Sequence, residues 1–284
     1  MLNIYDGEST GGTAKEFGLP GEHFAFNEAL VEGPTPAGLS PDAWIDVRAR
    51  FLSGAYGPRL GRVRKALAQQ EDALRSYPNH EEVILWFDNE LFCQVNLIYL
   101  LDWFARQTLG RTKLSLICIG EFPGKPDFHG LGELRGDQLA TLLDARQQIT
   151  RAKLELGSKA WQAYCSADPL ELTRLLEQNT SALPYLNECL VAHLMRFPSV
   201  RNGLGHVENR ALEFIAAGAK TFSPLFLQFR DQDPKYGFGD LQLWSCLWRL
   251  IAASKPLISV GDLKANNAPT KRRRFGSAEF EITE

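Results

Sequence analysis

The sequence predicts an α/β protein: a Rossmann-like, mainly parallel sheet domain, a helical middle segment and a C-terminal winged helix-turn-helix. In the first half, short apolar runs that end in polar loops alternate with helical patterns, which is typical of βαβ units with right-handed crossovers. The middle shows helical spacing only. The last part shows three helical patterns and then two short apolar runs around a basic stretch. We place the boundaries at 1–148, 149–198 and 199–284.

The strands of the sheet are predicted from four apolar runs rich in Ile, Val, Phe and Tyr, each bounded by Gly, Pro, Asp or Asn. In chain order they are LNIYD (2–6), HFAFN (23–27), EEVILWFD (81–88) and KLSLICIG (113–120). Between them we expect a short helix from Thr10 to Phe17, a long helical region from Ser40 to about Ser76, and a helix over 90–107. Ser40 followed by Pro41 is typical of a helix start.

Polar loops follow all four predicted strands. In parallel α/β sheets, ligands bind in the crevice outside the carboxyl ends of the strands. The side chains expected at this edge are Asp6, Glu8, Ser9, Thr10, Glu28, Glu32, Asp88, Asn89, Glu90, Glu121 and His129. So many carboxylates suit a metal, an amine, or sugar and ribose hydroxyls better than a bare phosphate. The sequence therefore predicts a site for a small polar metabolite, with no cofactor indicated.

The same residues have a simpler interpretation as helix caps. Asp88 and Asn89 are good N-cap residues and Glu90 favours the helix dipole, although capping explains Asp88 less fully. The loop DGESTGG lacks both the GxGxxG spacing and the GK[ST] ending of phosphate loops, so Gly11 and Gly12 indicate a tight turn. No second histidine lies near His129, and we expect no structural zinc site.

A series of motifs spread over most of the chain carries a family resemblance: DGES, EGPTPAGLS, VRARFL, VILWFDNELFCQ, LSLICIGEFPG, FHGLG and FPSVRNGL. In these motifs the chain resembles an uncharacterised bacterial group, domain-of-unknown-function family 1835. The strand-end motif of that family has an acidic residue, then His and Asp, where this chain has Asp88, Asn89 and Glu90. The histidine is absent here. The resemblance implies the domain arrangement and the importance of the strand-end loops, and it implies no reaction.

Composition favours a soluble, cytoplasmic protein. No apolar run reaches the length of about 18 residues that a membrane span needs, and the N-terminus has no signal-peptide pattern. The five cysteines form no CxxC pair, which is typical of reduced thiols inside a core. Acidic residues are in excess over 1–198 and basic residues over 199–284, so the two parts should prefer different partners. The helices of 149–198 predict a spacer or a dimerisation bundle, and a homodimer is one possibility.

The C-terminal part predicts a winged helix from its order of elements. The helices are expected in HVENRALEFIAAG, TFSPLFLQFRD and FGDLQLWSCLWRLIAAS, and the strands in PLISVGD (256–262) and AEFEIT (278–283). Such a fold places its third helix in the major groove and its wing on phosphates. The candidate nucleic-acid-binding residues are Gln242, Arg249, Lys271, Arg272, Arg273 and Arg274. The alternative is a protein-interaction module, because the third helix is mostly apolar.

These observations leave three kinds of function open. The first is a regulator, in which the acidic cleft binds a small polar metabolite and the winged helix contacts nucleic acid or a protein. The second is a hydrolase or transferase that uses Asp88 or Glu90, with Glu32, a divalent metal, and His129 as acid or base. The third is an interaction protein without catalysis. We rank the regulator first because it uses both halves of the chain.

Overall fold

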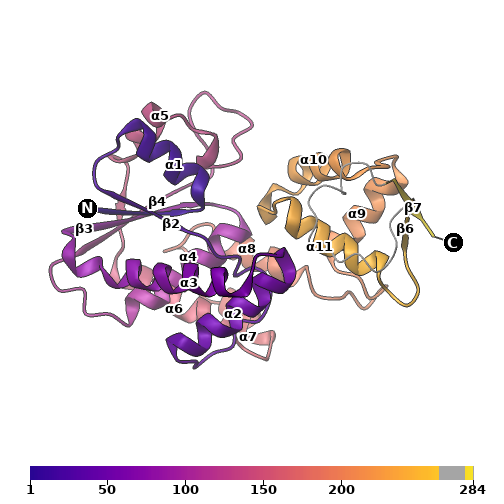
Figure 1. Ribbon diagram of the computed structural model, residues 1–284, viewed down its shortest axis with the longest axis horizontal. Helices are drawn as coiled ribbons and strands as arrows, with labels where there is room; N and C mark the ends of the chain where they lie inside the picture. The colour runs from indigo at the N-terminus through magenta and orange to yellow at the C-terminus, as the bar shows by residue number, and fades with distance from the viewer. Residues whose placement is uncertain (262–278, 284) are drawn as a thin grey trace.

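A computed structural model describes residues 1–261 and 279–283 of the chain, and Figure 1 shows them as two lobes. We call residues 1–198 the α/β lobe, and residues 199–261 with 279–283 the C-terminal lobe. The basic stretch from Lys271 to Arg274, predicted to contact nucleic acid, lies outside the described residues.

The α/β lobe is built on a mostly parallel five-stranded sheet. Its strands are β1 (Leu2–Asp6), β2 (Glu22–Phe26), β3 (Glu82–Asp88), β4 (Lys113–Ile119) and β5 (Gln147–Gln148). The order across the sheet is β2-β1-β3-β4-β5, and only β5 runs antiparallel to its neighbour. The four predicted strands are confirmed to within a residue or two. Strand β5 was not predicted, because two polar residues carry no strand pattern.

Helices cover both faces of this sheet. They are α1 (Glu8–Phe17), α2 (Pro41–Tyr56), α3 (Leu60–Arg75), α4 (Leu91–Ala105), α5 (Gly136–Leu142), α6 (Arg151–Tyr164), α7 (Leu170–Leu176) and α8 (Leu186–Leu194). Helices α1 and α5 lie on one face and α3, α4 and α6 on the other (Figure 1). Successive strand residues point to opposite faces, so Tyr5 and Trp86 pack in the α1 layer and Ile4 and Leu85 in the α4 layer.

The helical region predicted from Ser40 to Ser76 is two helices. The predicted start is confirmed: the Ser40 hydroxyl accepts the Ala43 N–H at 3.4 Å, with Pro41 in the first turn. Helix α2 ends at Tyr56; its C-cap residue Gly57 has a left-handed φ of 84°, and Pro58 follows. Since the residue before a proline disfavours the α conformation, the chain cannot continue as one helix.

The predicted middle segment lies against the sheet layer. Helix α6 packs along α4 so closely that a Cβ on Gly157 would lie 2.4 Å from the Leu101 Cβ. Helix α7 packs against α6, and α8 packs against α4. The segment therefore packs on the α4 side of the sheet.

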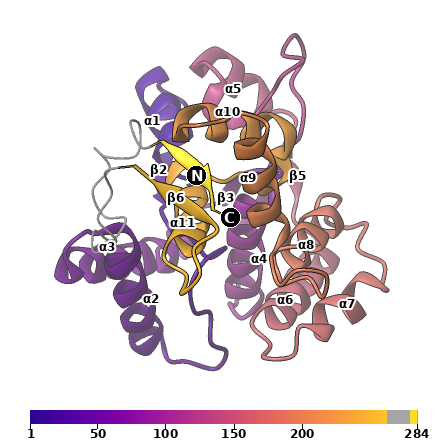
Figure 2. The ribbon, with the colours of Figure 1, turned by 90° about the vertical axis from the view of Figure 1, so that its right-hand side faces the viewer.

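The C-terminal lobe has three helices and a pair of short strands. They are α9 (His206–Ala216), α10 (Phe222–Gln232), α11 (Asp240–Ile251), β6 (Ile258–Val260) and β7 (Phe280–Ile282). The two strands pair antiparallel, and the Phe280 N–H donates to the Lys220 carbonyl at 2.7 Å, which ties β7 to the α9–α10 connection. In Figure 2 this lobe lies in front of the α/β lobe. Across the described residues, no helix combines the length and apolar character needed to cross a membrane.

Candidate functional site

The central strands β1 and β3 lie side by side, and the chain leaves their carboxyl ends toward opposite faces of the sheet. Helix α1 follows β1 on one face, and α4 follows β3 on the other. Ligand sites of α/β sheets form at such a point. Asp6 is the last residue of β1 and Asp88 the last of β3, with Glu90 two residues later. We call Asp6, Asp88 and Glu90 the strand-end carboxylates.

Asp6 is held by the helix that follows the neighbouring strand. Its carboxylate accepts a hydrogen bond from Asn96 Nδ2 at 2.8 Å, and the same amide donates to the Glu28 carbonyl at 3.0 Å. Asn96 is fully buried within α4. Burial raises the pKa of Asp6 to about 7 against the opposing effect of hydrogen bonds from Cys93 and Asn96, and the charge of Asp88 adds to the rise.

Asp88 fixes the loop after β4. Its Oδ1 accepts the Leu131 N–H at 2.8 Å, and a Cβ on Gly130 would lie only 2.9 Å from its Oδ2. Gly130 also has a φ of 143°, so glycine is required there for conformation and for space. Burial raises the pKa of Asp88 well above its usual range, and the negative charge of Glu90 raises it further.

Glu90 is the N-cap of α4, a role that the capping interpretation gave to Asp88 or Asn89. Its Oε1 accepts the Cys93 N–H at 3.3 Å. Its Oε2 is buried and receives no hydrogen bond from any described residue. A Cβ on Gly237, in the C-terminal lobe, would lie 2.2 Å from the Glu90 Cγ. Burial, with the charge of Asp6, raises the pKa of Glu90 despite the hydrogen bond at the cap.

Within residues 1–261 and 279–283, no basic side chain forms an ion pair with any strand-end carboxylate. Nor do three His, Cys, Asp or Glu side chains in that part of the chain gather closely enough to hold a metal ion. The cluster can therefore hold protons at neutral pH, and it can accept hydrogen bonds from a cationic or hydroxyl-bearing group.

A cavity of about 380 Å³ opens beside Glu90, and both lobes line it. The α/β lobe contributes Asn89, Glu90, Gly120, Phe128, His129 and Glu188. The C-terminal lobe contributes Phe229, Arg230, Asp233, Pro234, Lys235, Gly237, Phe238 and Gly239. Asp6 and Asp88 lie behind Glu90 and do not line the cavity. We call this space the interlobe cavity.

No protein-family model matches the chain, and no curated protein matches it either.

Other residues predicted at the sheet edge have local roles. Glu8 Oε1 accepts the Asn27 amide at 2.7 Å, and the Ser9 hydroxyl contacts the Gly132 carbonyl at 3.5 Å. Thr10 is buried within α1. These residues lie on the α1 side of the sheet edge and take no part in the wall of the interlobe cavity.

Glu28 and Glu32 are engaged away from the strand-end carboxylates. Glu28 forms a buried ion pair with Arg48, with contacts of 2.7 and 3.1 Å, and this pair holds the loop after β2. Glu32 accepts the Tyr56 hydroxyl and lines a separate cavity of about 480 Å³. Each of these two carboxylates is bound by a partner on α2, Arg48 for Glu28 and Tyr56 for Glu32.

Three further residues predicted at the sheet edge lie in loops near the interlobe cavity, and two of them line it. Asn89 is exposed, and its amide lies so close to Gly120 that a Cβ there would be 2.6 Å from Nδ2. His129 reaches the C-terminal lobe, with its Nε2 4.0 Å from Asp231. Glu121 is exposed outside the cavity.

Two residues predicted to contact nucleic acid from the third helix lie at the lobe interface. Gln242 is 8% exposed, and its amide donates to the Tyr56 hydroxyl at 2.9 Å. Arg249 pairs with Glu208 at 2.9 Å and lines the same cavity as Glu32. In this arrangement Gln242 is not available to a base edge, because α11 turns that face toward α2.

Sequence reasoning missed the residues that hold the site together. Asn96 and Gln94 interrupt the apolar pattern of α4, and each binds a strand end: Gln94 Nε2 donates to the Asp88 carbonyl at 2.7 Å. Polar residues inside an otherwise apolar helix were the available signal. Arg230, Lys235 and Gly237 reach the cavity from the other lobe, and no local pattern marks them.

Proposed function

We propose that the protein is a small-molecule-responsive regulator, in which the interlobe cavity binds a small polar metabolite and the C-terminal lobe passes the response to nucleic acid or a protein. The observation that carries the proposal is the contact of Glu90 with Gly237. A carboxylate from the switch point of the sheet lies directly against the second lobe, so a ligand at Glu90 changes the contact between the lobes.

The chemistry of the cavity suggests the class of ligand. The buried Oε2 of Glu90 lacks a donor, and an amine or a hydroxyl group that separates Glu90 from Gly237 would supply one. Arg230 and Lys235 line the opposite wall, and Lys235 forms no ion pair with a described residue. A metabolite with an amine or several hydroxyls at one end and an acidic group at the other matches both walls.

The C-terminal lobe supports the second half of the proposal through its order of elements. Three helices followed by an antiparallel strand pair is the order of a winged helix, and the chain between β6 and β7 contains the run from Lys271 to Arg274. We propose that this run contacts phosphates, while α11 serves the lobe interface. A protein partner is the alternative within the same proposal.

A thermal-shift screen tests ligand binding. The compounds are amino acids, nucleotides, sugar phosphates and divalent metals, and the variants are Glu90→Gln and, as a matched control, Glu121→Gln. At a hundredfold excess over the dissociation constant, a ligand stabilises the native state by about 2.7 kcal/mol, which is easily seen. We expect a shift that Glu90→Gln removes and Glu121→Gln keeps. A screen without any shift, or a shift that both variants keep, would contradict the proposed site.

The second half is tested by nucleic-acid binding at several salt concentrations. Alanine at Lys271, Arg272, Arg273 and Arg274 should weaken binding and flatten its salt dependence, since each phosphate contact releases counterions. A ligand found in the screen should change the wild-type affinity. If the affinity and its salt dependence are unchanged by these substitutions, the run does not contact phosphates, and a protein partner becomes the alternative to test.

A second candidate function is acid–base catalysis. The observation that favours it is the cluster of raised pKa values, because a carboxyl that titrates near neutral pH can both take up and release a proton. Glu90 would be the acid or base and His129 its partner across the cavity. Incubating any compound that binds with the protein and following its conversion by mass spectrometry tests this. Binding without conversion of the compound would contradict catalysis and support only the regulator.

A further inference from the structure

A second cavity lies between α2, α3, α4 and α6, on the helical side of the sheet. Its volume is about 550 Å³, within the range of about 300–1,000 Å³ typical of small-molecule sites. We call it the aromatic cavity. Its lining from α4 starts at Tyr99 and Trp103, whereas Glu90 caps the start of the same helix. At 1.5 Å per residue these side chains begin roughly 14–20 Å from Glu90, so the two sites are separate.

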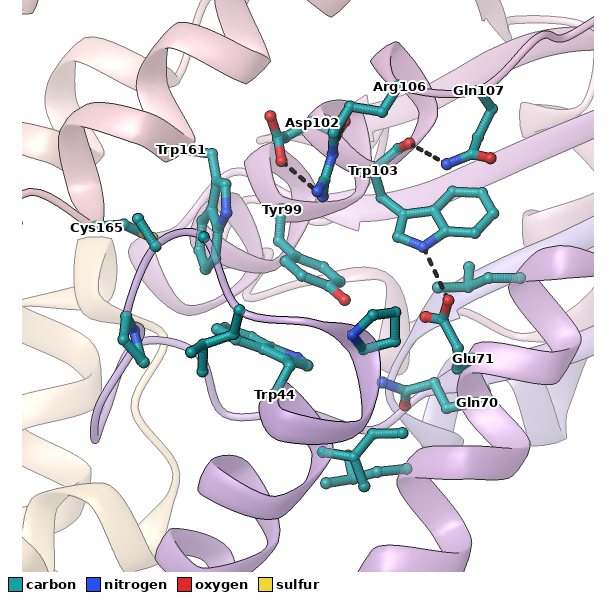
Figure 3. A pocket seen from close by; sticks show the side chains of 18 of the residues that line it. Trp44, Gln70, Glu71, Tyr99, Asp102, Trp103, Arg106, Gln107, Trp161 and Cys165 are labelled. Carbon is teal, nitrogen blue, oxygen red and sulfur yellow. Dashed lines mark hydrogen bonds and ion pairs between the residues drawn. The ribbon is translucent and has the colours of Figure 1, made fainter.

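Four aromatic rings build its walls. Trp44 stacks parallel to Tyr99, with ring centroids 5.6 Å apart, and Trp161 meets the Tyr99 ring edge-on at 5.1 Å. Trp103 stands on the other side of the opening (Figure 3). Trp44, Tyr99 and Trp161 contact one another and are held rigidly, which lowers the entropy cost of binding a flat molecule against them.

The hydroxyl of Tyr99 is the unusual feature of this cavity. The Tyr99 side chain is only 8% exposed, yet no hydrogen bond from a described residue reaches its hydroxyl. Figure 3 shows this hydroxyl pointing into the cavity toward Gln70 and Glu71. The ring of Tyr99 is packed within the protein, whereas its hydroxyl faces the open cavity, where a ligand can donate a hydrogen bond to it or accept one from it.

The charges around the cavity cancel within the protein. Glu71 accepts from Arg75 at 2.9 Å and from the Trp103 indole at 3.4 Å. Asp102 pairs with Arg106 at 2.9 Å and accepts the Ser158 hydroxyl at 2.8 Å. Each carboxylate is therefore neutralised by its own arginine, and the cavity has no need of a charged ligand.

We propose that the aromatic cavity binds a neutral, planar molecule of one or two aromatic rings, held against Trp44 and Trp103 and hydrogen-bonded to the Tyr99 hydroxyl. The site uses the opposite chemistry from the interlobe cavity and does not depend on it. Indole and adenosine are suitable probes, because both are neutral, contain a fused two-ring system and carry a hydrogen-bonding N–H. Choline, which is cationic and has no ring, tests the alternative of an aromatic cage for cations.

Saturation-transfer NMR and titration of each probe against the full chain measure the binding. We expect indole or adenosine to bind and choline not to. Tyr99→Phe should weaken binding by about tenfold, the usual effect of losing one buried hydrogen bond. Trp44→Leu should abolish it. The matched control is Tyr5→Phe, which removes a buried hydroxyl in the α1 layer and should leave the affinity unchanged.

Three results would overturn the proposal: neither neutral probe binds at millimolar concentration, choline binds more tightly than both, or Tyr99→Phe binds as tightly as wild type. Because Tyr99→Phe keeps the ring, it should fold, and a thermal melt of each variant verifies this.

Discussion

The two ends of α4 handle buried charge in opposite ways. At its C-terminal end, Asp102 pairs with Arg106 four residues later. At its start, Glu90 has one hydrogen bond at the cap, a second oxygen without a partner, and two further carboxylates behind it. Burying an unpaired carboxylate costs free energy, and an ion pair with a basic side chain reduces that cost. The comparison teaches that acidity alone does not identify a site. Acidic groups left without basic partners do.

The largest effect should come from breaking a paired carboxylate. Arg48→Met leaves Glu28 buried without its partner and should lower the free energy of unfolding by about 3–5 kcal/mol. Glu90→Gln removes a charge that has no such partner and should change stability by less than about 1 kcal/mol, or raise it. Urea denaturation of both variants measures the difference. Equal losses would remove the distinction between paired and unpaired carboxylates.

The next effect concerns the contact between the lobes. Gly237→Ala places a methyl group against Glu90 at a left-handed φ of 60°, and we expect a loss of about 2–4 kcal/mol. The control is Gly110→Ala, where φ is 59° and nothing lies within 4 Å of the new Cβ. This control should lose only the backbone part, about 1 kcal/mol. Thermal melts compare the two, and equal losses would mean that Glu90 and Gly237 are not in close contact.

A smaller, pH-dependent effect should follow from the raised pKa of Asp88. The folded protein keeps this carboxyl protonated at pH values where the unfolded chain has lost the proton. Stability from this group is therefore lost as pH rises through the folded-state pKa. Asp88→Asn keeps an acceptor for Leu131 and removes the titration.

Relative to wild type, Asp88→Asn should gain about 2 kcal/mol in unfolding free energy between pH 5 and pH 8.5. Burial lowers the pKa of His193 to about 3. Its contribution to the pH dependence of stability is the same in both proteins, so it cancels in the difference. The control Asp137→Asn should show no such gain, because Arg135 lowers the pKa of that exposed carboxyl. Urea denaturation at both pH values makes the measurement, and parallel curves for Asp88→Asn and wild type would contradict the raised pKa.

The smallest effect is expected at the second interface between the lobes. Tyr56→Phe removes the hydroxyl that donates to Glu32 and accepts from Gln242, and should cost about 1 kcal/mol. Replacing Gln242 with Leu as well should restore part of the loss, since no amide is then left unsatisfied. A double-mutant cycle measures this coupling, and strictly additive losses would show that the two side chains do not interact.

Much of the fold could be predicted because its signals are local. The strands end where apolar runs meet polar loops, and this pattern placed Asp6 and Asp88 at strand ends correctly. Gly57 and Pro58 also indicate the break between α2 and α3, although the prediction treated 40–76 as one long helical region. Strand β5 had no signal, being two glutamines.

The site was predictable only in part, because it depends on partners distant in the sequence. Glu28 and Glu90 both lie in polar loops, and the sequence does not distinguish them. Only the folded chain shows that Arg48 pairs with Glu28 and that Gly237 packs against Glu90. Likewise, the apolar face of α11 left open whether the helix is buried, and Tyr56 fixes the side on which Gln242 lies.

The most direct test of the strand-end carboxylates is a carbon-13 NMR titration of the side-chain carboxyls in the full chain, assigned with Asp6→Asn, Asp88→Asn and Glu90→Gln. We expect the resonances of these three residues to titrate near neutral pH, and replacing one residue to lower the midpoints of the others. Three carboxyls that all titrate below about pH 5, as ordinary Asp and Glu do, would contradict an unneutralised cluster at the switch point of the sheet.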